Sequence, residues 1–332
     1  MNNQSLYPEA RFWKRKGESI LCELCPHACI LHEGQSGLCG SRIHEAGKLR
    51  STVYGYPSAL QSDPIEKKPL FHFLPGTRTF SIGTQGCNLS CKFCQNWHLS
   101  AQHGREHEYV SPKELVLAAK NNRCKSIAFT YNEPIIFAEY ALDIIDLAEQ
   151  EKIPCIFVTN GYVSELARET VFSGLRAVNI DLKAFSDTIY RHYTGGSLRP
   201  VLDTILWCVN KGIHTEITTL LIPGVNDDDL SLEKSTQWIV KNCGEDTPLH
   251  LTAFHPDYMM TDHPGTSRQS LERARKIATA SGLRYVYVGN YPGFDNNTYC
   301  PQCGEIVIER RGYQVTLHKE HQHSLPIIRR LP

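Results

Sequence analysis

The sequence predicts an α/β fold in which short strands of a parallel sheet alternate with amphipathic helices. Between residues 79 and 293, β-branched or apolar runs alternate with longer segments of helical periodicity, which is typical of successive βα units. With 332 residues, 41% of them hydrophobic, the chain can bury a large core and exceeds the usual size of one domain. We therefore expect one main domain with appendages.

The predicted strands and helices follow each other in order along this region. Strands are expected at 80–83, 126–130, 155–159, 177–182, 214–221 and 249–253, with a further one at 285–289. The first helix is expected to begin at Ser111-Pro-Lys-Glu114, a capping box with proline at the first helical position. Further helices are expected at about 135–151, 164–173, 199–211, 231–242 and 267–281.

Each of the first six predicted strands is followed by residues that an ordinary connecting loop does not need. In chain order these are Cys87 to Cys94, Asn132-Glu133-Pro134, Asn160-Gly161, Lys183, Pro223 to Asp227, and His255-Pro256. In a (β/α) barrel these strand ends share one face, where chemistry is carried out. A doubly wound open sheet would spread them along an edge, and no glycine-rich dinucleotide fingerprint follows the first strand. The barrel is therefore favoured.

The cysteines mark the domain organisation. Three groups occur among the thirteen: Cys22, Cys25, Cys29 and Cys39, then Cys87, Cys91 and Cys94, then Cys300 and Cys303. They divide the chain into a Cys-rich N-terminal accessory region (1–75), a core barrel (76–293) and a C-terminal extension (294–332). The stretch 47–75, rich in proline and charge, is predicted to be irregular. The four single cysteines, Cys124, Cys155, Cys208 and Cys243, are expected to be small core residues.

Composition indicates a cytoplasmic protein without a membrane span. The number of cysteines is odd, and no apolar stretch follows the charges near the N-terminus, so a secreted disulfide scaffold is disfavoured. The most apolar segment, 134–147, is interrupted by three acidic residues. Lysine plus arginine equals aspartate plus glutamate at 35 each, so no long-range field would gather nucleic acid or an anionic membrane.

Cys87, Cys91 and Cys94 stand at Cys-x3-Cys-x2-Cys spacing directly after the first predicted strand. Three thiolates on one loop can hold three irons of a cubane cluster and leave the fourth iron without a protein ligand. A zinc site or three structural cysteines are the alternatives, but zinc wants four ligands. The run, with Phe93 before the third cysteine, resembles the signature of the radical S-adenosylmethionine (SAM) superfamily. That resemblance implies that SAM chelates the open iron and is cleaved reductively to a 5′-deoxyadenosyl radical for hydrogen-atom abstraction.

The chain from about 22 to 313 is similar to the radical SAM component of the AmmeMemoRadiSam system, a group that resembles pyruvate formate-lyase activating enzymes. The likeness is carried by the early Cys-x2-Cys-Pro-x2-Cys with Gly34-Gln-Ser-Gly-Leu-Cys39, the run Asp63-Pro-Ile-Glu-Lys-Lys-Pro-Leu-Phe-His72, and the signature. It implies a partial (β/α)6 TIM barrel, a SAM-bound 4Fe–4S cluster, an oxygen-sensitive enzyme, a low-potential donor of the flavodoxin or ferredoxin type, and a protein or small-molecule substrate.

Two other functions are open alternatives. One is activation of a glycyl-radical enzyme such as pyruvate formate-lyase, which rests on the shared signature. The other is a Cys-rich metal-binding or electron-transfer protein without catalytic activity. This last alternative leaves the residues at the strand ends unexplained.

The resemblance also assigns SAM contacts to residues at the strand ends. Thr130-Tyr-Asn-Glu-Pro134 occupies the place of the superfamily's Gly-Gly-Glu-Pro segment, whose backbone and acid bind the SAM amino group. Because Tyr131 and Asn132 replace the usual glycines, Glu133 matches better than its neighbours. The remaining contacts that the resemblance implies are Asn160, Asp181, Lys183 and, near the ribose, His255.

Each of these residues also has a plainer interpretation. Asp181 and Lys183 share one face of a strand and could form an internal ion pair. Glu133 could cap the helix that follows it, and His255 could be a turn residue.

The two flanking cysteine groups have metal-ligand spacing. Cys22, Cys25, Cys29 and Cys39 fit zinc or a second iron–sulfur cluster, with either a structural role or an electron relay to the barrel. Cys300 and Cys303 resemble the first knuckle of a zinc ribbon, but the second Cys-x2-Cys knuckle of related proteins is missing. The tail offers His318, His321 and His323 instead.

Overall fold

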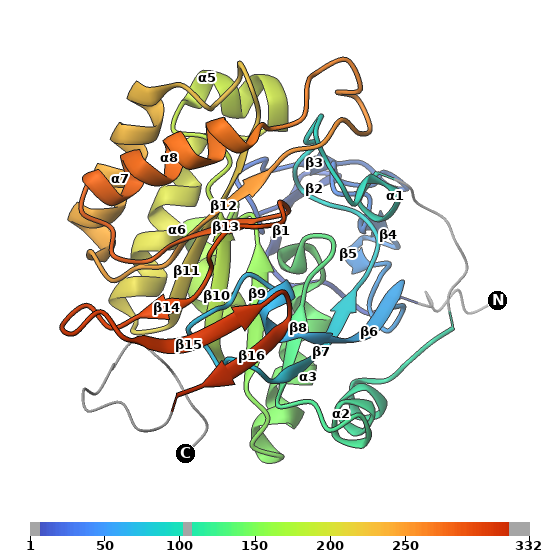
Figure 1. The fold of residues 1–332 in the computed structure, drawn as a ribbon. Coiled ribbons are helices and arrows are strands. Elements are labelled where there is room, and N and C mark those ends of the chain that lie inside the picture. Colours follow the sequence, from blue (N-terminus) through green and yellow to red (C-terminus); the bar gives the residue numbers. More distant parts are fainter. Residues whose placement is uncertain (1–6, 102–107, 319–332) are drawn as a thin grey trace.

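The computed structural model describes residues 7–101 and 108–318, and an eight-stranded sheet forms its centre (Figure 1). The strand order is β13-β12-β11-β10-β9-β8-β7-β6. Seven strands are parallel: β7 (Arg78–Gly83), β8 (Ser126–Phe129), β9 (Cys155–Thr159), β10 (Leu175–Asp181), β11 (His214–Leu221), β12 (Leu249–Ala253) and β13 (Val286–Gly289). All seven were predicted, with small differences at the ends.

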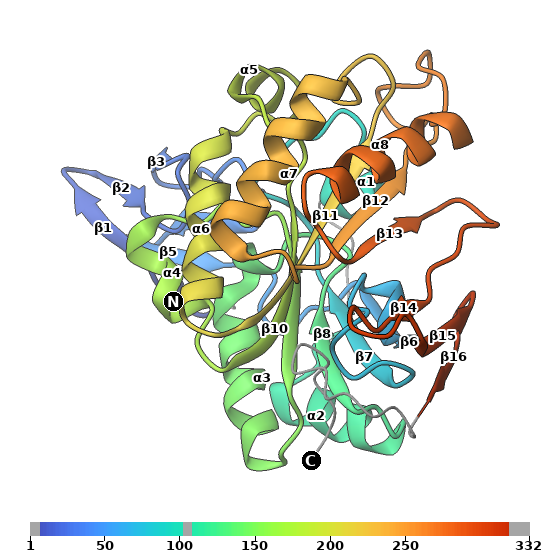
Figure 2. The same cartoon turned by 60° about the vertical axis from the view of Figure 1, so that its left-hand side comes forward.

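The order of the sheet excludes the doubly wound alternative. Each parallel strand pairs with the parallel strands next to it in the sequence, and the strand order never reverses across the sheet. Because βαβ crossovers are right-handed, the helices that connect these strands all lie on the same face of the sheet. Strands β6 and β13 lie at opposite ends of the order, which makes the sheet a partial rather than a closed barrel. Figure 2 shows α6 (Leu198–Asn210) and α7 (Asp229–Cys243) side by side along the outside of the sheet.

The predicted helices are present. Besides α6 and α7 they are α2 (Pro112–Asn121), α3 (Ala138–Gln150), α4 (Glu165–Val171) and α8 (Arg268–Ala280), with a short 3-10 turn, η2 (Pro134–Phe137), before α3. The capping box of α2 forms as expected: Ser111 Oγ accepts from the Glu114 N–H at 3.3 Å, and Glu114 Oε2 accepts from the Ser111 N–H at 2.7 Å. In the part of the chain that the structure describes, no helix has the length and apolar character needed to cross a membrane.

Three short helical segments between β7 and β11 were not predicted. They are α1 (Trp97–Ser100), α5 (Asp187–Ile189) and the π-helical turn η3 (Tyr190–Thr194). None spans two turns of amphipathic pattern, so the sequence carries no periodic signal for them.

The prediction that 47–75 is irregular was wrong for about half of this stretch, although 52–58 and 68–75 do lack helix and strand. This stretch contains part of a hairpin, β4 (Arg42–Glu45) with β5 (Lys48–Ser51), then β6 (Ala59–Pro64) and the turn η1 (Ile65–Lys67). Strand β6 pairs antiparallel with β7 along its whole length and adds the eighth strand to the sheet. Its sequence lacks apolar alternation and ends in proline, as suits a sheet edge, so the pattern gave no strand signal.

A buried carboxylate joins the segment after β6 to the amino ends of the later strands. Glu216 on β11 accepts hydrogen bonds from His214 Nε2 at 2.9 Å and His250 Nε2 at 2.6 Å. It also accepts from the backbone N–H groups of Phe71 and His72, at 3.0 and 2.8 Å. The run around Phe71 is thereby fixed at the end of the sheet opposite to the strand ends that carry the predicted site.

The C-terminal extension is a small antiparallel sheet of β14 (Thr298–Tyr299), β15 (Ile306–Arg311) and β16 (Gln314–Leu317). Arg310 anchors it to the core: its Nη2 donates to the Phe71 carbonyl at 2.6 Å, and its guanidinium lies 4.4 Å from the centre of the Phe71 ring. The N-terminal region forms a three-stranded sheet of β1 (Trp13–Lys16), β2 (Ser19–Cys22) and β3 (Ile30–Leu31), besides the β4-β5 hairpin.

Candidate functional site

A cleft of about 640 Å³ opens where the parallel strands end. Every one of the seven parallel strands, or the loop directly after it, contributes to its lining. In chain order the contributors include Cys87, Cys91, Cys94, Glu133, Asn160, Asp181, Lys183, Leu220, Thr252 and Asn290. The carboxyl ends of parallel strands are where barrel enzymes carry out their chemistry. The cleft is thus the candidate site.

The loop between β7 and α1 brings three thiols to the wall of this cleft. The backbone N–H of Leu89 donates to Cys87 Sγ at 3.4 Å, and the Asn160 amide lies 3.8 Å from the same sulfur. N–H groups directed at sulfur are the second-shell contacts that tune thiolate ligands. Burial raises the pKa of Cys87, and it raises that of Cys91 to about 12, so metal ligation must displace the thiol protons.

The number of these thiols suits a cluster. Three thiolates can hold three irons of a cubane, whereas a structural zinc site takes four protein ligands. Within residues 7–101 and 108–318, no group of three or more Cys, His, Asp or Glu side chains is arranged to hold a single metal ion.

Glu133 is buried at the end of β8, 2% exposed, and lines the cleft. Its Oε1 accepts from the Ile135 N–H at 3.0 Å and from Thr159 Oγ1 at 2.6 Å, while its Oε2 accepts from the Asn160 N–H at 2.7 Å. Glu133 therefore caps the helical turn that follows it, as the plainer interpretation expected. A carboxylate has about four acceptor positions, and the three protein donors leave one of them for a ligand in the cleft. Burial raises the pKa of Glu133 to about 7.

Asp181 and Lys183 form the ion pair that their spacing allows, with Nζ to Oδ2 at 3.0 Å. The Lys183 ammonium also lies 5.9 Å from the centre of the Phe93 ring, and all three side chains line the cleft. Burial acts to lower the pKa of Lys183, but the Asp181 carboxylate outweighs it and raises that pKa above its ordinary value. An ammonium has three donors, so the pair leaves hydrogen-bonding capacity toward the cleft.

Two predicted amides line the cleft and hold its loops together. The side chain of Asn132 makes three hydrogen bonds, each of 3.0 Å, to the loop after β7. Its Oδ1 accepts from the Thr84 N–H, and its Nδ2 donates to Thr84 Oγ1 and to the Gly86 carbonyl. Asn160 Nδ2 donates to Asn88 Oδ1 at 2.9 Å, and its Oδ1 accepts from the Tyr162 N–H at 2.8 Å. Both amides thus fix the loop that carries the cysteines.

Other predicted residues are not among those that line the cleft. His255 is exposed, contacts the carbonyl of Pro256, and is not among the lining residues. Cys300 is buried and Cys303 exposed in the C-terminal sheet, where Cys303 Sγ lies 3.7 Å from a carboxylate oxygen of Glu305. His318 lies 3.6 Å from Glu309, whereas His321 and His323 fall outside the described residues.

Two further features of the cleft were not predicted. Gln95 lines it, and its buried Nε2 has no hydrogen-bond partner among the described residues. Tyr131, with a φ of 71°, donates to Asp63 at 2.5 Å, and the Lys68 ammonium lies 4.3 Å from its ring. Asp63 and Lys68 belong to the run 63–72 and Tyr131 to the run Thr130–Pro134, but neither run indicated that these side chains meet.

The donors fit the two groups that the signature implies. Three thiols, one buried carboxylate with a free acceptor position, one ammonium and one unpaired amide N–H converge on a cleft large enough for a nucleoside-sized ligand. SAM carries an ammonium, a carboxylate and a ribose diol, which these groups complement. The fold and cleft thereby define an α/β partial-barrel enzyme with a cluster-type thiol loop at its active face.

Comparison with known proteins agrees with this class. The model of the Radical SAM superfamily matches residues 81–232. The uncharacterized protein MJ0808 of Methanocaldococcus jannaschii is 39% identical over 306 residues, which is 91% of either chain. The chain belongs to the radical SAM superfamily. It is a radical SAM enzyme, and its cofactors are a 4Fe–4S cluster and SAM.

More distant relatives share the fold. Pyruvate formate-lyase 1-activating enzyme of Escherichia coli K12 is 24% identical over 230 residues, covering 64% of this chain and 93% of its own. The crystal structure of a radical SAM methyltransferase from Sphaerobacter thermophilus has a TM-score of 0.51 at 17% identity, over 65% of this chain and 67% of its own. The eight-stranded, mostly parallel sheet is the partial barrel of this superfamily.

Proposed function

We propose that Cys87, Cys91 and Cys94 hold the cluster, and that the protein is the radical SAM component of an AmmeMemoRadiSam system. When bound, the cluster supplies the electron that cleaves SAM to a 5′-deoxyadenosyl radical, which abstracts a hydrogen atom from the substrate. The observation that carries this proposal is the convergence of the three thiols with Glu133 and Lys183 on one cleft.

The residues around the thiols orient SAM. Glu133, whose carboxylate keeps one acceptor position toward the cleft, accepts a hydrogen bond from the SAM amino group. Lys183 donates to the SAM carboxylate from its ion pair with Asp181. The ring of Phe93, which is 4% exposed, lies beside the Lys183 ammonium, and Asn160 holds the loop at Cys87.

A reductant and a substrate complete the reaction. The reductant is a low-potential flavodoxin- or ferredoxin-type donor, and the substrate is a protein or small molecule delivered to the open side of the cleft. The even charge balance offers no broad field for nucleic acid. We keep 1–75, 76–293 and 294–332 as the proposed division of the chain, with β6 contributed to the core sheet by the first region.

The experiment is formation of 5′-deoxyadenosine by anaerobically reconstituted protein with a strong chemical reductant, without added substrate. Wild type should form it, and Cys94→Ala should not. Cys155→Ala is the matched control, since this thiol is buried on β9 away from the cleft lining and should leave turnover intact. Equal turnover in Cys94→Ala and wild type would remove the loop from the reaction.

Activation of a glycyl-radical enzyme is the second candidate, favoured by the similarity to the E. coli activating enzyme over 93% of that protein. That match leaves about a third of this chain uncovered, whereas MJ0808 matches 91% of it. Incubation with pyruvate formate-lyase under SAM-cleaving conditions separates the two. A stable glycyl radical signal would establish the second function, and its absence alongside competent SAM cleavage would support the first.

A further inference from the structure

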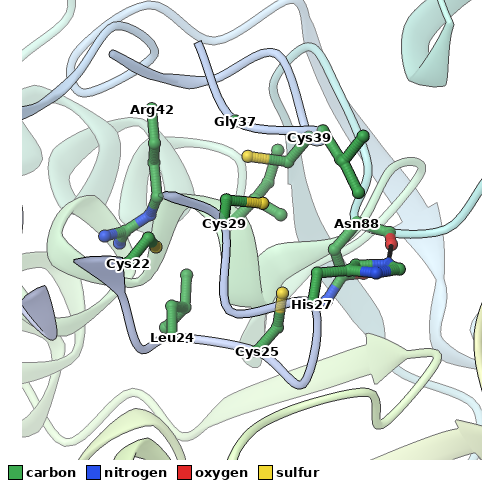
Figure 3. Close-up of a pocket in the computed structure, with 11 residues that line it drawn as sticks. Cys22, Leu24, Cys25, His27, Cys29, Gly37, Cys39, Arg42 and Asn88 are labelled. Atoms are coloured by element: carbon green, nitrogen blue, oxygen red, sulfur yellow. Dashed lines mark hydrogen bonds between the residues drawn. The ribbon is translucent and has the colours of Figure 1, made fainter. Parts of the chain in front are cut away.

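The four N-terminal cysteines surround a small enclosed space beside the core barrel. Cys22, Cys25, Cys29 and Cys39 are all free thiols and line one cavity, together with Arg42 and with Asn88 of the signature loop. Figure 3 shows the sulfurs of Cys25, Cys29 and Cys39 turned toward this common space. Gly37 lies beside this space, since a Cβ built on it would be 3.8 Å from the sulfurs of both Cys29 and Cys39.

Arg42 gives an independent sign that this space receives a ligand. Its side chain is 1% exposed; Nη2 donates to both carboxylate oxygens of Glu139, at 2.6 and 2.7 Å, and Nη1 donates to the Arg11 carbonyl at 2.9 Å. Its Nε–H is buried and has no partner among the described residues, although the side chain lines the cavity. An unpaired buried donor costs about 1–3 kcal/mol, so we expect an acceptor to occupy the cavity.

Hydrogen bonds connect this cavity to the signature loop. His27, between Cys25 and Cys29, donates Nε2–H to the Asn88 carbonyl at 2.7 Å. Asn160 Nδ2 donates to Asn88 Oδ1 at 2.9 Å and lies 3.8 Å from Cys87 Sγ. The two loops also touch directly, since a Cβ on Gly86 would lie 2.2 Å from the Cys39 carbonyl oxygen.

We propose that Cys22, Cys25, Cys29 and Cys39 hold a second iron–sulfur cluster that passes electrons to the signature cluster. Four thiolates saturate a cubane, and the Arg42 Nε–H donates to one of its sulfur atoms. A reduced flavodoxin-type donor loses one electron to this cluster, which then loses one electron to the signature cluster. A zinc ion held by the same four thiolates could not pass an electron, so the identity of the bound metal separates the two possibilities.

Metal content of a chain without the signature cysteines tests the site independently of SAM chemistry. The triple variant Cys87→Ala, Cys91→Ala, Cys94→Ala, reconstituted anaerobically, should retain about four iron and four sulfide per chain and a reduced-state resonance that SAM does not alter. Adding Cys25→Ser and Cys29→Ser should remove this iron, whereas adding Cys243→Ser, a half-buried lone thiol, should not. Bound zinc without iron, or no metal in a folded chain, would overturn the cluster.

Arg42→Lys tests the predicted donor, because it keeps the charge beside Glu139 and removes the Nε–H. Iron content should be retained, and the reduction potential of the second cluster should become more negative, since a hydrogen bond to its sulfur is lost. An unchanged potential would contradict the contact.

The relay rests on the proposed function and has its own test. In Cys25→Ser/Cys29→Ser protein, 5′-deoxyadenosine formation driven by reduced flavodoxin should be lost, while formation driven by titanium(III) citrate should persist. Equal activity with both donors would contradict the relay. Loss with both, in protein that keeps a SAM-responsive signature cluster, would also contradict it.

Discussion

The backbone N–H of Asn160 donates to Glu133 Oε2 at 2.7 Å, which joins the loops after β8 and β9 at the wall of the cleft. The same carboxylate caps η2 through Ile135 and accepts from Thr159. Capping and ligand binding are therefore compatible roles of one side chain. Three protein donors fix its orientation, so its remaining acceptor position is aimed before a ligand arrives.

SAM affinity should depend on pH through Glu133. Burial raises the pKa of this carboxyl to about 7, so it is mostly neutral at pH 6 and mostly ionised at pH 8. Because the N–H groups of the SAM amino nitrogen bind the ionised carboxylate better than the neutral acid, affinity should rise about tenfold over this range. Isothermal titration calorimetry of wild type and Glu133→Gln checks this. A pH dependence that survives unchanged in Glu133→Gln would assign it to another group.

The stability of the ligand-free protein should respond to pH in the opposite direction. The folded-state pKa of Glu133 lies above the ordinary value of 4.5, so the native state holds more protons between pH 4.5 and 7. The contribution of Glu133 to the free energy of unfolding is fully present below pH 4.5. It is lost as the pH rises through about 7, and the loss is about 3 kcal/mol at most. Urea unfolding at several pH values, with Glu133→Gln as the control, measures the slope; an equal slope in the variant would exclude Glu133.

Lys183→Ala should weaken SAM binding on the order of tenfold or more, the scale for one charge-assisted contact to a carboxylate. The matched control is Lys92→Ala, which removes an ammonium on the cysteine loop that lies 3.2 Å from His192 Nε2 and is not part of the cleft lining. Unchanged SAM affinity in Lys183→Ala would remove this residue from the site.

Gln95→Ala should lower SAM affinity about fivefold, the value of one hydrogen bond of about 1 kcal/mol, without lowering the melting temperature. The reason is that its Nε2 lines the cleft but makes no hydrogen bond within the described chain. Gln61→Ala, on the exposed side of β6, serves as the control. A loss of stability with no loss of affinity would show that Gln95 acts in the fold instead.

Glu216 should control stability and leave the cleft unaffected. Burial acts to raise its pKa, but hydrogen bonds from His214 and His250 outweigh this and hold the pKa well below the ordinary range. Glu216→Ala should lower the free energy of unfolding in urea by about 3–5 kcal/mol, because the buried N–H donors around Glu216 lose their acceptor. The contribution of Glu216 to the stability of the wild type is present above pH 4.5, and it is lost as the pH falls through the lowered pKa of this carboxyl in the folded state. Reduced SAM affinity in the folded variant would contradict this separation.

The main sheet and most of the cleft could be predicted from the sequence because their signals are local. Strands such as β9 and β12 are apolar runs with turn residues on either side, and the Ser111 capping box fixes the start of α2. Residues at successive strand ends, such as Glu133 and Lys183, converge because parallel strands end on one face.

The features that the sequence did not predict depend on distant partners. Arg42 is recognisable only beside Glu139, 97 positions away in the chain. Gln95 stands out only once the folded loop leaves its amide unpaired. Strand β6 is polar and becomes a strand through pairing with β7. His255, assigned by resemblance alone, lies outside the cleft lining, and its contact with SAM stays a prediction.

The central claim is that SAM binds a cluster held by Cys87, Cys91 and Cys94, and electron paramagnetic resonance of the reduced, anaerobically reconstituted protein tests it most directly. The wild-type signal should change when SAM is added, and the SAM-responsive component should be missing from Cys91→Ala but present in the buried-thiol control Cys208→Ala. A SAM-responsive signal that survives intact in Cys91→Ala would contradict the assignment of the loop.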